Sequence, residues 1–179
     1  FVLASGAPIV RTWGGLEALR GMECFDLGRI GVSGQRPANI AIGSADTILS
    51  LGARFGQAVT GPSFHHLVSD SATVFSVDCD PEEIRLLEDT TPAIGILGTV
   101  DDFLKVASRR PFTPSAGLDP WLSFCSKVLS TCAEEYPAHE EQGVDQYRLL
   151  EALDNVLTKQ DTLVVDGGGT GFYCAMQTF

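Results

Sequence analysis

The sequence predicts an α/β fold in which a parallel sheet is flanked by helices. Four short runs are rich in apolar residues along their length, which is typical of strands covered on both faces. Segments with helix-start signals separate these runs, and regular alternation of strands and helices favours parallel pairing through crossover connections. The expected strands are residues 8–11, Thr47–Leu51, Thr73–Asp78 and Ala93–Leu97.

Three helices are expected between and after these strands. Residues 37–42 begin with a proline, which the first turn of a helix tolerates well. A second helix opens in the same way at Pro81, with acidic residues near the positive end of the helix dipole. Thr99 is placed to cap a helix over Val100–Ala107, with Asp102 at the third helical position.

A break in this alternation predicts the end of the first domain. Residues 108–118 contain two prolines among small polar residues, and such a segment cannot continue a helix or a central strand. We therefore assign residues 1–107 to a central α/β domain and residues 108–144 to a linker that contains a helix. Residues 145–179 are expected to be the start of a second α/β domain.

The later elements follow helical and strand patterns in turn. The linker helix carries Cys125 and Cys132 two turns apart on one face, where we expect them to be buried as small hydrophobes. A helix capped by Asp145 is expected over residues 146–157. The second domain then opens with a strand at residues 162–165, a glycine-rich turn and a further helix.

The charge of the chain argues against two classes of partner. Lysine and arginine number 12 against 23 aspartates and glutamates, which gives a net charge of −11. Such a chain repels nucleic acid and anionic membrane surfaces. Its longest apolar runs are much shorter than the roughly 18 residues of a membrane span, so no transmembrane segment is predicted.

The chain ends and the cysteines indicate the cellular compartment and whether the chain is a fragment. The sequence lacks an initiator methionine and a basic region before the first apolar residues, so no signal peptide is expected; both ends look like cuts in a longer protein. The 5 cysteines include no Cys-x-x-Cys pair, which argues against a zinc ribbon or a disulfide framework. We expect a reducing cytoplasm and no metal site.

The glycine-rich turn is the first candidate site. Backbone N–H groups in such a turn, next to a helix N-terminus, bind diphosphate oxygens. The turn has neither the lysine of a P-loop nor a full dinucleotide fingerprint, and a simple tight turn is the alternative. The candidate residues are Asp166, Gly167, Gly168, Gly169 and Thr170.

A second candidate site lies where two expected strands end. Ligands of open α/β sheets bind at the carboxyl ends of strands, where Gly52 and Arg54 follow one strand, and Asp78 and Asp80 end and follow the next. Arg54 is placed for an anionic group, and an acid here is placed for a ribose. The alternatives are a surface arginine paired with an acid and, for Asp80, a helix N-cap.

Four segments stand out by their order and spacing: residues 8–12, residues 31–39, residues 45–61 and residues 77–84. Together they resemble the central domain of thiamine-diphosphate-dependent enzymes of the acetolactate synthase type. Residues 166–168 resemble the Asp-x-Gly turn that opens the diphosphate-binding domain of these enzymes. Gly168 matches that turn, whereas Gly167, Gly169 and Thr170 stand where acetolactate synthases have Val, Gln and His.

The resemblance implies thiamine diphosphate and Mg²⁺ as cofactors, 2-oxo acids as substrates, and a homo-oligomer, a dimer or a tetramer. The glutamate that activates the cofactor belongs to another domain of such enzymes. The metal motif, Gly-Asp-Gly followed by Asn, does not occur in this sequence. We therefore expect the full-length protein to be an enzyme, and the 179-residue chain alone to be inactive, without catalytic residues or metal ligands.

The resemblance also bears on the groove at the strand ends. The central domain holds FAD in acetolactate synthases, and ADP or nothing in some relatives. Gly52, Arg54, Asp78 and Asp80 match positions that line this groove. Residues 56–58, Gly-Gln-Ala, replace the Asp-Asp-Arg of flavin-binding members, so FAD, ADP and an empty groove all stay open.

Taken together, the residues and the resemblance predict a fragment of an enzyme that decarboxylates and ligates 2-oxo acids. One alternative is a non-catalytic nucleotide-binding or interaction module built on the same α/β domain. A second is a sirtuin-like NAD-dependent deacylase, whose fold is topologically related. The absence of Cys-x-x-Cys pairs and of a Gly-Ala-Gly start argues against the deacylase.

Overall fold

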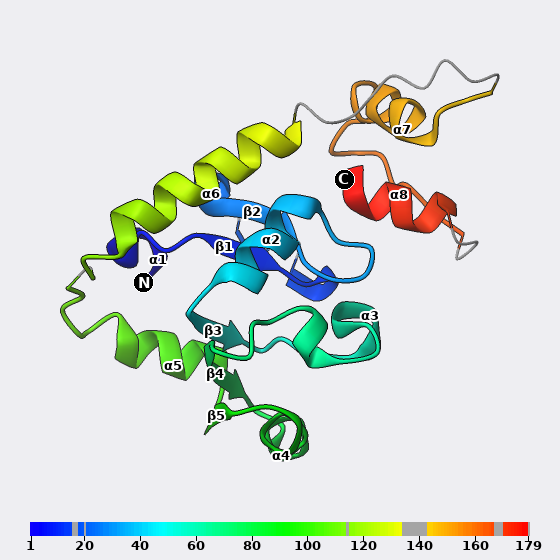
Figure 1. The fold of residues 1–179 in the computed structure, drawn as a ribbon. Coiled ribbons are helices and arrows are strands. Elements are labelled where there is room, and N and C mark those ends of the chain that lie inside the picture. Colours follow the sequence, from blue (N-terminus) through cyan, green and yellow to red (C-terminus); the bar gives the residue numbers. More distant parts are fainter. Residues whose placement is uncertain (16–17, 20, 114, 134–142, 167–169, 179) are drawn as a thin grey trace. The chain divides into compact units, whose positions relative to one another are not determined.

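The computed structural model describes residues 1–15, 18–19, 21–113, 115–133, 143–166 and 170–178 (Figure 1). The chain divides into two compact units, Phe1–Glu134 and Glu135–Phe179, which are described separately. The elements are α1 (Val2–Ser5), β1 (Ile9–Arg11), η1 (Trp13–Gly15), η2 (Glu23–Phe25), β2 (Asp26–Arg29), α2 (Arg36–Ser44), β3 (Thr47–Leu51), α3 (Gln57–Thr60), η3 (Phe64–His66), β4 (Thr73–Asp78), α4 (Pro81–Thr90), β5 (Ala93–Leu97), α5 (Val100–Ala107), α6 (Leu118–Ala133), α7 (Gln146–Asp154) and α8 (Thr170–Thr178), where η denotes a 3-10 helix.

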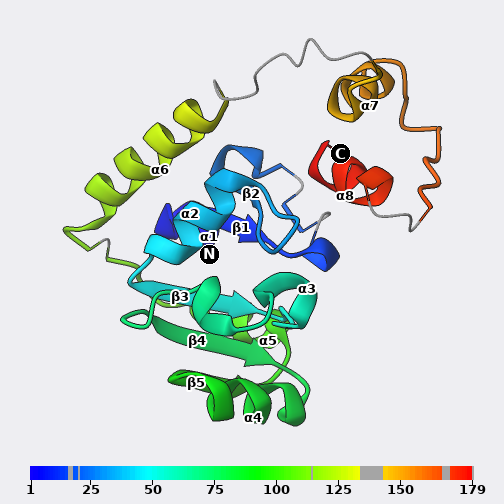
Figure 2. The same ribbon diagram turned by 45° about the vertical axis from the view of Figure 1, so that its right-hand side comes forward.

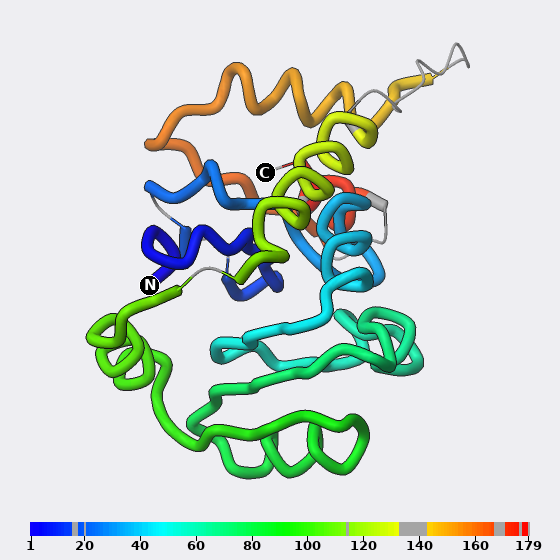
Figure 3. Tube along the Cα trace, turned by 60° about the vertical axis from the view of Figure 1, so that its left-hand side comes forward, coloured from blue at the N-terminus to red at the C-terminus, as the bar shows by residue number. Residues whose placement is uncertain are grey.

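The first unit contains the parallel pairing that the sequence predicts. β3, β4 and β5 form one sheet with β4 in the centre (Figure 2). Leu51 lies opposite Val77, and Asp78 lies opposite Leu97, so all three strands end at the same edge. The bounds of these three strands are those expected from the sequence. Figure 3 shows the chain passing from β3 through α3 to β4, and through α4 to β5.

The predicted parallel α/β fold is confirmed, but its strands form two sheets and not one. β1 pairs in parallel with β2, and these two strands form a separate sheet. β2 was not expected because its sequence, Asp-Leu-Gly-Arg, contains no β-branched or aromatic residue. Its strand conformation is supported by contacts outside the segment, including an ion pair of 2.5 Å between Arg11 Nη2 on β1 and Asp26 Oδ2.

The central strand β4 is covered on both faces. Val74 and Val77 are 1% and 0% exposed, and residues three apart in a strand point to opposite faces. Val74 packs in a cluster with Ile42, Phe64 and Leu87. This two-sided burial agrees with the near-continuous apolar runs from which the parallel sheet was predicted.

Side-chain caps fix the starts of two helices beside the sheet. The Asp80 side chain accepts a hydrogen bond from the Glu82 N–H and caps α4. The Thr99 hydroxyl oxygen accepts a hydrogen bond of 3.1 Å from the Asp102 N–H and caps α5, as predicted. α4 therefore begins directly after the end of β4, which carries Asp78, and α5 begins after the end of β5.

A second apolar cluster joins α6 to the two-stranded sheet. Cys125 on α6 packs with Leu27 on β2 and Ala41 on α2. Cys125 and Cys132 are both buried, which confirms the prediction for this helix face. All five cysteines of the chain are free thiols.

The second unit is helical in the part of the chain that the structure describes. Asp145 caps α7 as expected: its Oδ1 accepts a hydrogen bond of 3.1 Å from the Arg148 N–H. Tyr147 on α7 donates a hydrogen bond to Gln177 on α8. The helix expected after the glycine-rich turn is α8.

The strand expected at residues 162–165 is not formed, and these residues have no regular secondary structure. A strand needs a partner for its backbone N–H and C=O groups, and no described segment pairs with this one. Val164 is 88% exposed, as expected for an apolar residue without a sheet to enter. The apolar pattern therefore predicted a strand that local sequence alone cannot stabilise.

One finding concerns membrane-spanning helices, and one prediction concerns the domain boundaries. Among the described residues, no helix has both the length and the apolar character needed to cross a membrane. The predicted domain boundaries at residues 107 and 144 stay a prediction.

Candidate functional site

The carboxyl ends of β3 and β4 lie side by side because the two strands run parallel in one sheet. The Gly52 N–H donates a hydrogen bond of 2.8 Å to the Val77 carbonyl, which joins the two strand ends. Gly52 has φ of 60°, in the left-handed region that favours glycine. The Gly98 N–H after β5 donates a hydrogen bond of 2.9 Å to the Asp78 carbonyl. The three strand ends thus form one connected edge.

The Arg54 side chain extends from this edge to α4. Its Nε donates a hydrogen bond of 2.7 Å to Glu83 Oε1, and its Nη2 contacts the same oxygen. The Arg54 side chain is 73% exposed, whereas that of Glu83 is 27% exposed. The hydrogen bond and charge of Glu83 raise the pKa of Arg54, and the charges of Asp80 and Asp78 add to this effect. The structure therefore brings together Arg54, Asp78 and Asp80, three of the four groove residues, with Gly52 shaping the turn.

The two groove aspartates already accept backbone hydrogen bonds. Asp78 Oδ1 accepts one of 2.9 Å from the Asp80 N–H, and Asp80 Oδ1 accepts one of 2.9 Å from the Glu82 N–H. The helix-cap interpretation of Asp80 is therefore confirmed. Both bonds use the Oδ1 atom, so the Oδ2 atom of each carboxylate can accept a hydrogen bond from a ligand hydroxyl.

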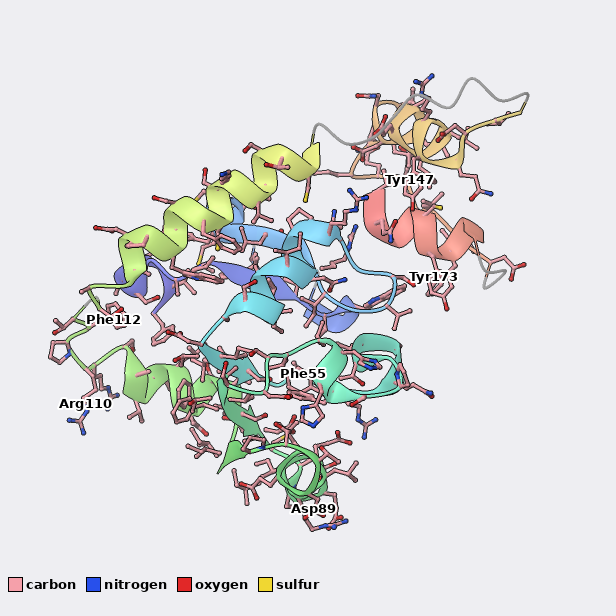
Figure 4. All side chains as sticks on the ribbon, in the orientation of Figure 1. Phe55, Asp89, Arg110, Phe112, Tyr147 and Tyr173 are labelled. Atoms are coloured by element: carbon pink, nitrogen blue, oxygen red, sulfur yellow. The ribbon has the colours of Figure 1, made fainter. Side chains whose placement is uncertain are left out.

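A pocket of about 420 Å³ adjoins this edge. Phe55 after β3 and Phe64 of η3 meet edge to face beside it, with ring centroids 5.1 Å apart. Figure 4 labels Phe55, which lies between α3 and α4. The pocket is lined by Ala53, Phe55, Thr60, Pro62, Ser63, Phe64, His65, Ser76, Asp78, Glu83, Leu86, Leu87 and Thr90.

Sequence reasoning missed Glu83 and the aromatic pair as site residues. Glu83 was expected only as an acid in the first turn of a helix, and its contact with Arg54 spans 29 residues. The available signal was the shared edge of two predicted parallel strands, which places the start of one helix beside the other strand's loop. Arg54 itself matches the alternative of a surface arginine paired with an acid.

The turn after β2 that contains Gly31 packs closely against α3. Gly31 has φ of 123°, and a Cβ there would lie 3.1 Å from the Ala58 carbonyl oxygen. The Val32 N–H donates a hydrogen bond of 3.3 Å to that oxygen. Ala58 is exposed, and its side chain is only a methyl group.

The diphosphate-turn candidates are placed only in part. Gly167, Gly168 and Gly169 lie outside the described residues. Asp166 is exposed, and Thr170 is the first residue of α8. In this unit the structure gives a separate hollow of about 480 Å³ lined by Asp154, Leu157, Thr158, Lys159, Asp161, Leu163, Val165 and Ala175.

The described residues contain no group of three or more histidine, cysteine, aspartate or glutamate side chains placed to hold a metal ion. His65 Nδ1 lies 2.6 Å from Asp70 Oδ1. The chemistry of the strand-end site is therefore that of one guanidinium beside several carboxylates, which suits a ligand with both an anionic group and hydroxyls.

Comparison with known proteins places this chain in a family. Residues 1–106 match the thiamine pyrophosphate enzyme central domain. The chain is 32% identical to the large subunit of acetolactate synthase isozyme 2 of Escherichia coli, over 52% of this chain and 17% of that protein. It is 28% identical to a probable chloroplastic acetolactate synthase 2 of rice, over 94% of this chain and 26% of that protein. A chloroplastic acetolactate synthase 1 of maize is 36% identical over 47% of this chain and 13% of that protein.

The chain thus spans about a quarter or less of the length of these relatives. The family match covers β1 to β5 and α2 to α4, and it includes the strand ends that carry Gly52, Arg54, Asp78 and Asp80. The chain belongs to the thiamine pyrophosphate enzymes, and its residues 1–106 match their central domain.

Proposed function

We propose that this chain is part of a thiamine-diphosphate-dependent enzyme of the acetolactate synthase type, which decarboxylates and ligates 2-oxo acids. The family match over residues 1–106 is the observation that supports this proposal most strongly. Relatives named acetolactate synthase match up to 94% of the chain. When bound, thiamine diphosphate accepts the electron pair released with CO₂. Mg²⁺ is the metal that the resemblance implies.

In this proposal residues 1–107 form the central domain, residues 108–144 link the domains, and residues 145–179 begin the diphosphate-binding domain. Asp166, Gly167, Gly168, Gly169 and Thr170 would then form the diphosphate-side turn. The chemistry of a glycine turn before α8 suits this role, because its N–H groups and the helix N-terminus attract anionic oxygens. The groups that react with the 2-oxo acid would come from other segments of the full protein.

We further infer that the strand-end groove of the central domain binds an adenine nucleotide, either ADP or the ADP part of FAD. Arg54 is the cation there and is mostly exposed to solvent. Asp78 offers a second carboxylate oxygen to a ribose hydroxyl, and Gly52 keeps the strand end open for close approach of the ligand. The residues present therefore fit one phosphate contact and one ribose contact.

The same proposal includes the cellular compartment and the oligomeric state. All five thiols are free, which suits a reducing compartment such as the cytoplasm. The rice and maize relatives are described as chloroplastic, so a plastid is the alternative. A homo-oligomer, dimer or tetramer, is proposed for the full-length protein on the resemblance alone.

Calorimetric titration of ADP and of FAD into the wild type and Arg54→Ala tests the groove. A charge-assisted hydrogen bond to phosphate predicts that Arg54→Ala weakens nucleotide affinity by about 10- to 150-fold. Arg109→Ala, in the predicted linker, is the matched control and is expected to leave affinity unchanged. Equal affinities for the wild type and Arg54→Ala would remove Arg54 from the site.

A further inference from the structure

We propose that Glu83 is a specificity-determining residue of the strand-end site, because it holds Arg54 in competition with the phosphate of a nucleotide. This inference rests on the proposed nucleotide site. It adds a selective element: a ligand must bring enough negative charge to replace Glu83 as the partner of Arg54. Ligands with a weakly charged group are then bound less well than a diphosphate.

The geometry makes Glu83 the fixed partner and Arg54 the movable one. Glu83 lies in the first turn of α4, whose start is held by the Asp80 cap and by Pro81. Its side chain is 27% exposed, whereas that of Arg54 is 73% exposed. Arg54 Nε and Nη2 both contact Glu83 Oε1, so one carboxylate oxygen engages two donors of the guanidinium. A phosphate that approaches these donors meets the Glu83 charge at the same place.

The loops that follow β3 and β4 supply no second lysine or arginine to offset this competition. Arg54 is the only lysine or arginine between Arg36 and Arg85 in the sequence, a stretch that contains β3, β4 and their loops. Arg85 pairs with Glu82 at 2.9 Å and with Asp89 at 2.9 Å. The position where flavin-binding members carry the arginine of Asp-Asp-Arg is Ala58 here. The balance between Glu83 and a phosphate is therefore decided at Arg54 alone among these loops.

Glu83→Gln tests the proposal with a nearly unchanged side-chain shape. Removing the charge releases Arg54 for phosphate, and ADP affinity is expected to rise about two- to fivefold. Glu82→Gln is the matched control, because it removes the same charge from the same helix turn while leaving the Arg54 contact intact. Its effect on affinity is expected to be smaller than that of Glu83→Gln by about twofold or more.

ADP is titrated into the wild type, Glu83→Gln, Glu82→Gln, Arg54→Ala and the double variant Glu83→Gln/Arg54→Ala. The gain from Glu83→Gln should disappear when Arg54 is absent. Equal affinities of Glu83→Gln and Glu82→Gln would overturn the role of Glu83, while a loss in Arg54→Ala would leave the nucleotide site standing. If Arg54→Ala binds ADP as tightly as its parent in both backgrounds, Arg54 is not part of the site, and the role of Glu83 fails with it. If the wild type binds no ADP, the nucleotide site itself fails.

Discussion

Asp80 and Arg54 each have the structural role that the sequence analysis gave as the alternative to ligand binding. Asp80 caps α4 through one oxygen, and Arg54 pairs with Glu83. Both roles follow from short-range chemistry that a sequence displays. The identity of the partner of Arg54 does not, because Glu83 comes beside it only when β3 and β4 pair in register.

The cysteines allow a prediction at the same scale. Burial raises the pKa of the Cys125 thiol, so less of it is thiolate at a given pH than in an ordinary exposed cysteine. Cys24 and Cys79 are exposed. Iodoacetamide labelling of the native chain at about pH 8, followed by peptide mapping, should modify Cys24 and Cys79 well before Cys125.

The same shift fixes a pH dependence of stability. The folded chain holds the Cys125 proton to higher pH than the unfolded chain does, so the unfolded state loses it first. The contribution of this group to stability is complete below the pKa of the unfolded thiol and is lost as the pH rises from there through the folded pKa. Labelling of Cys125 at the rate of Cys79 would contradict its burial.

At the level of elements, patterns that depend on local sequence were predicted with their bounds. β3, β4, β5 and α5 have the expected limits, because apolar runs and a threonine cap define them. Two strand predictions failed for one reason. β2 was missed and the strand at residues 162–165 was wrongly expected, because whether a segment becomes a strand depends on a partner. β2 forms without a β-rich sequence beside β1, and residues 162–165 have the sequence without a described partner.

The packing of α4 on β5 gives a prediction at this scale. A Cβ at Gly95 would lie 2.1 Å from Ile84 Cγ2 and 2.8 Å from Glu88 Oε1. Gly95→Ala must displace the Ile84 side chain or α4 itself, and we expect it to reduce the free energy of unfolding by about 1–3 kcal/mol. Gly98→Ala is the control, because a Cβ there would meet nothing within 4 Å.

Urea unfolding, followed by circular dichroism, compares the two glycine variants with the wild type. Gly98→Ala should stay within about 0.5 kcal/mol of the wild type. Equal unfolding midpoints for Gly95→Ala and Gly98→Ala would show that α4 does not pack on β5 as closely as described.

At the scale of the whole molecule, two kinds of information combined to define the site. The parallel sheet, its edge and four candidate residues follow from patterning and from the resemblance to a family. The pocket beside this edge could not be predicted, since Phe64 and Ser76 reach it from separate elements.

Pyruvate turnover by the purified 179-residue chain, with thiamine diphosphate and Mg²⁺ present, tests most directly whether this chain supplies a central domain or the reacting groups themselves. The chain is first shown to be folded by circular dichroism. We predict no release of CO₂ above that of a protein-free control, because the cofactor-activating glutamate and the metal motif belong to other segments of such enzymes. Sustained release of CO₂ in proportion to protein concentration would contradict the assignment of this chain to the central domain.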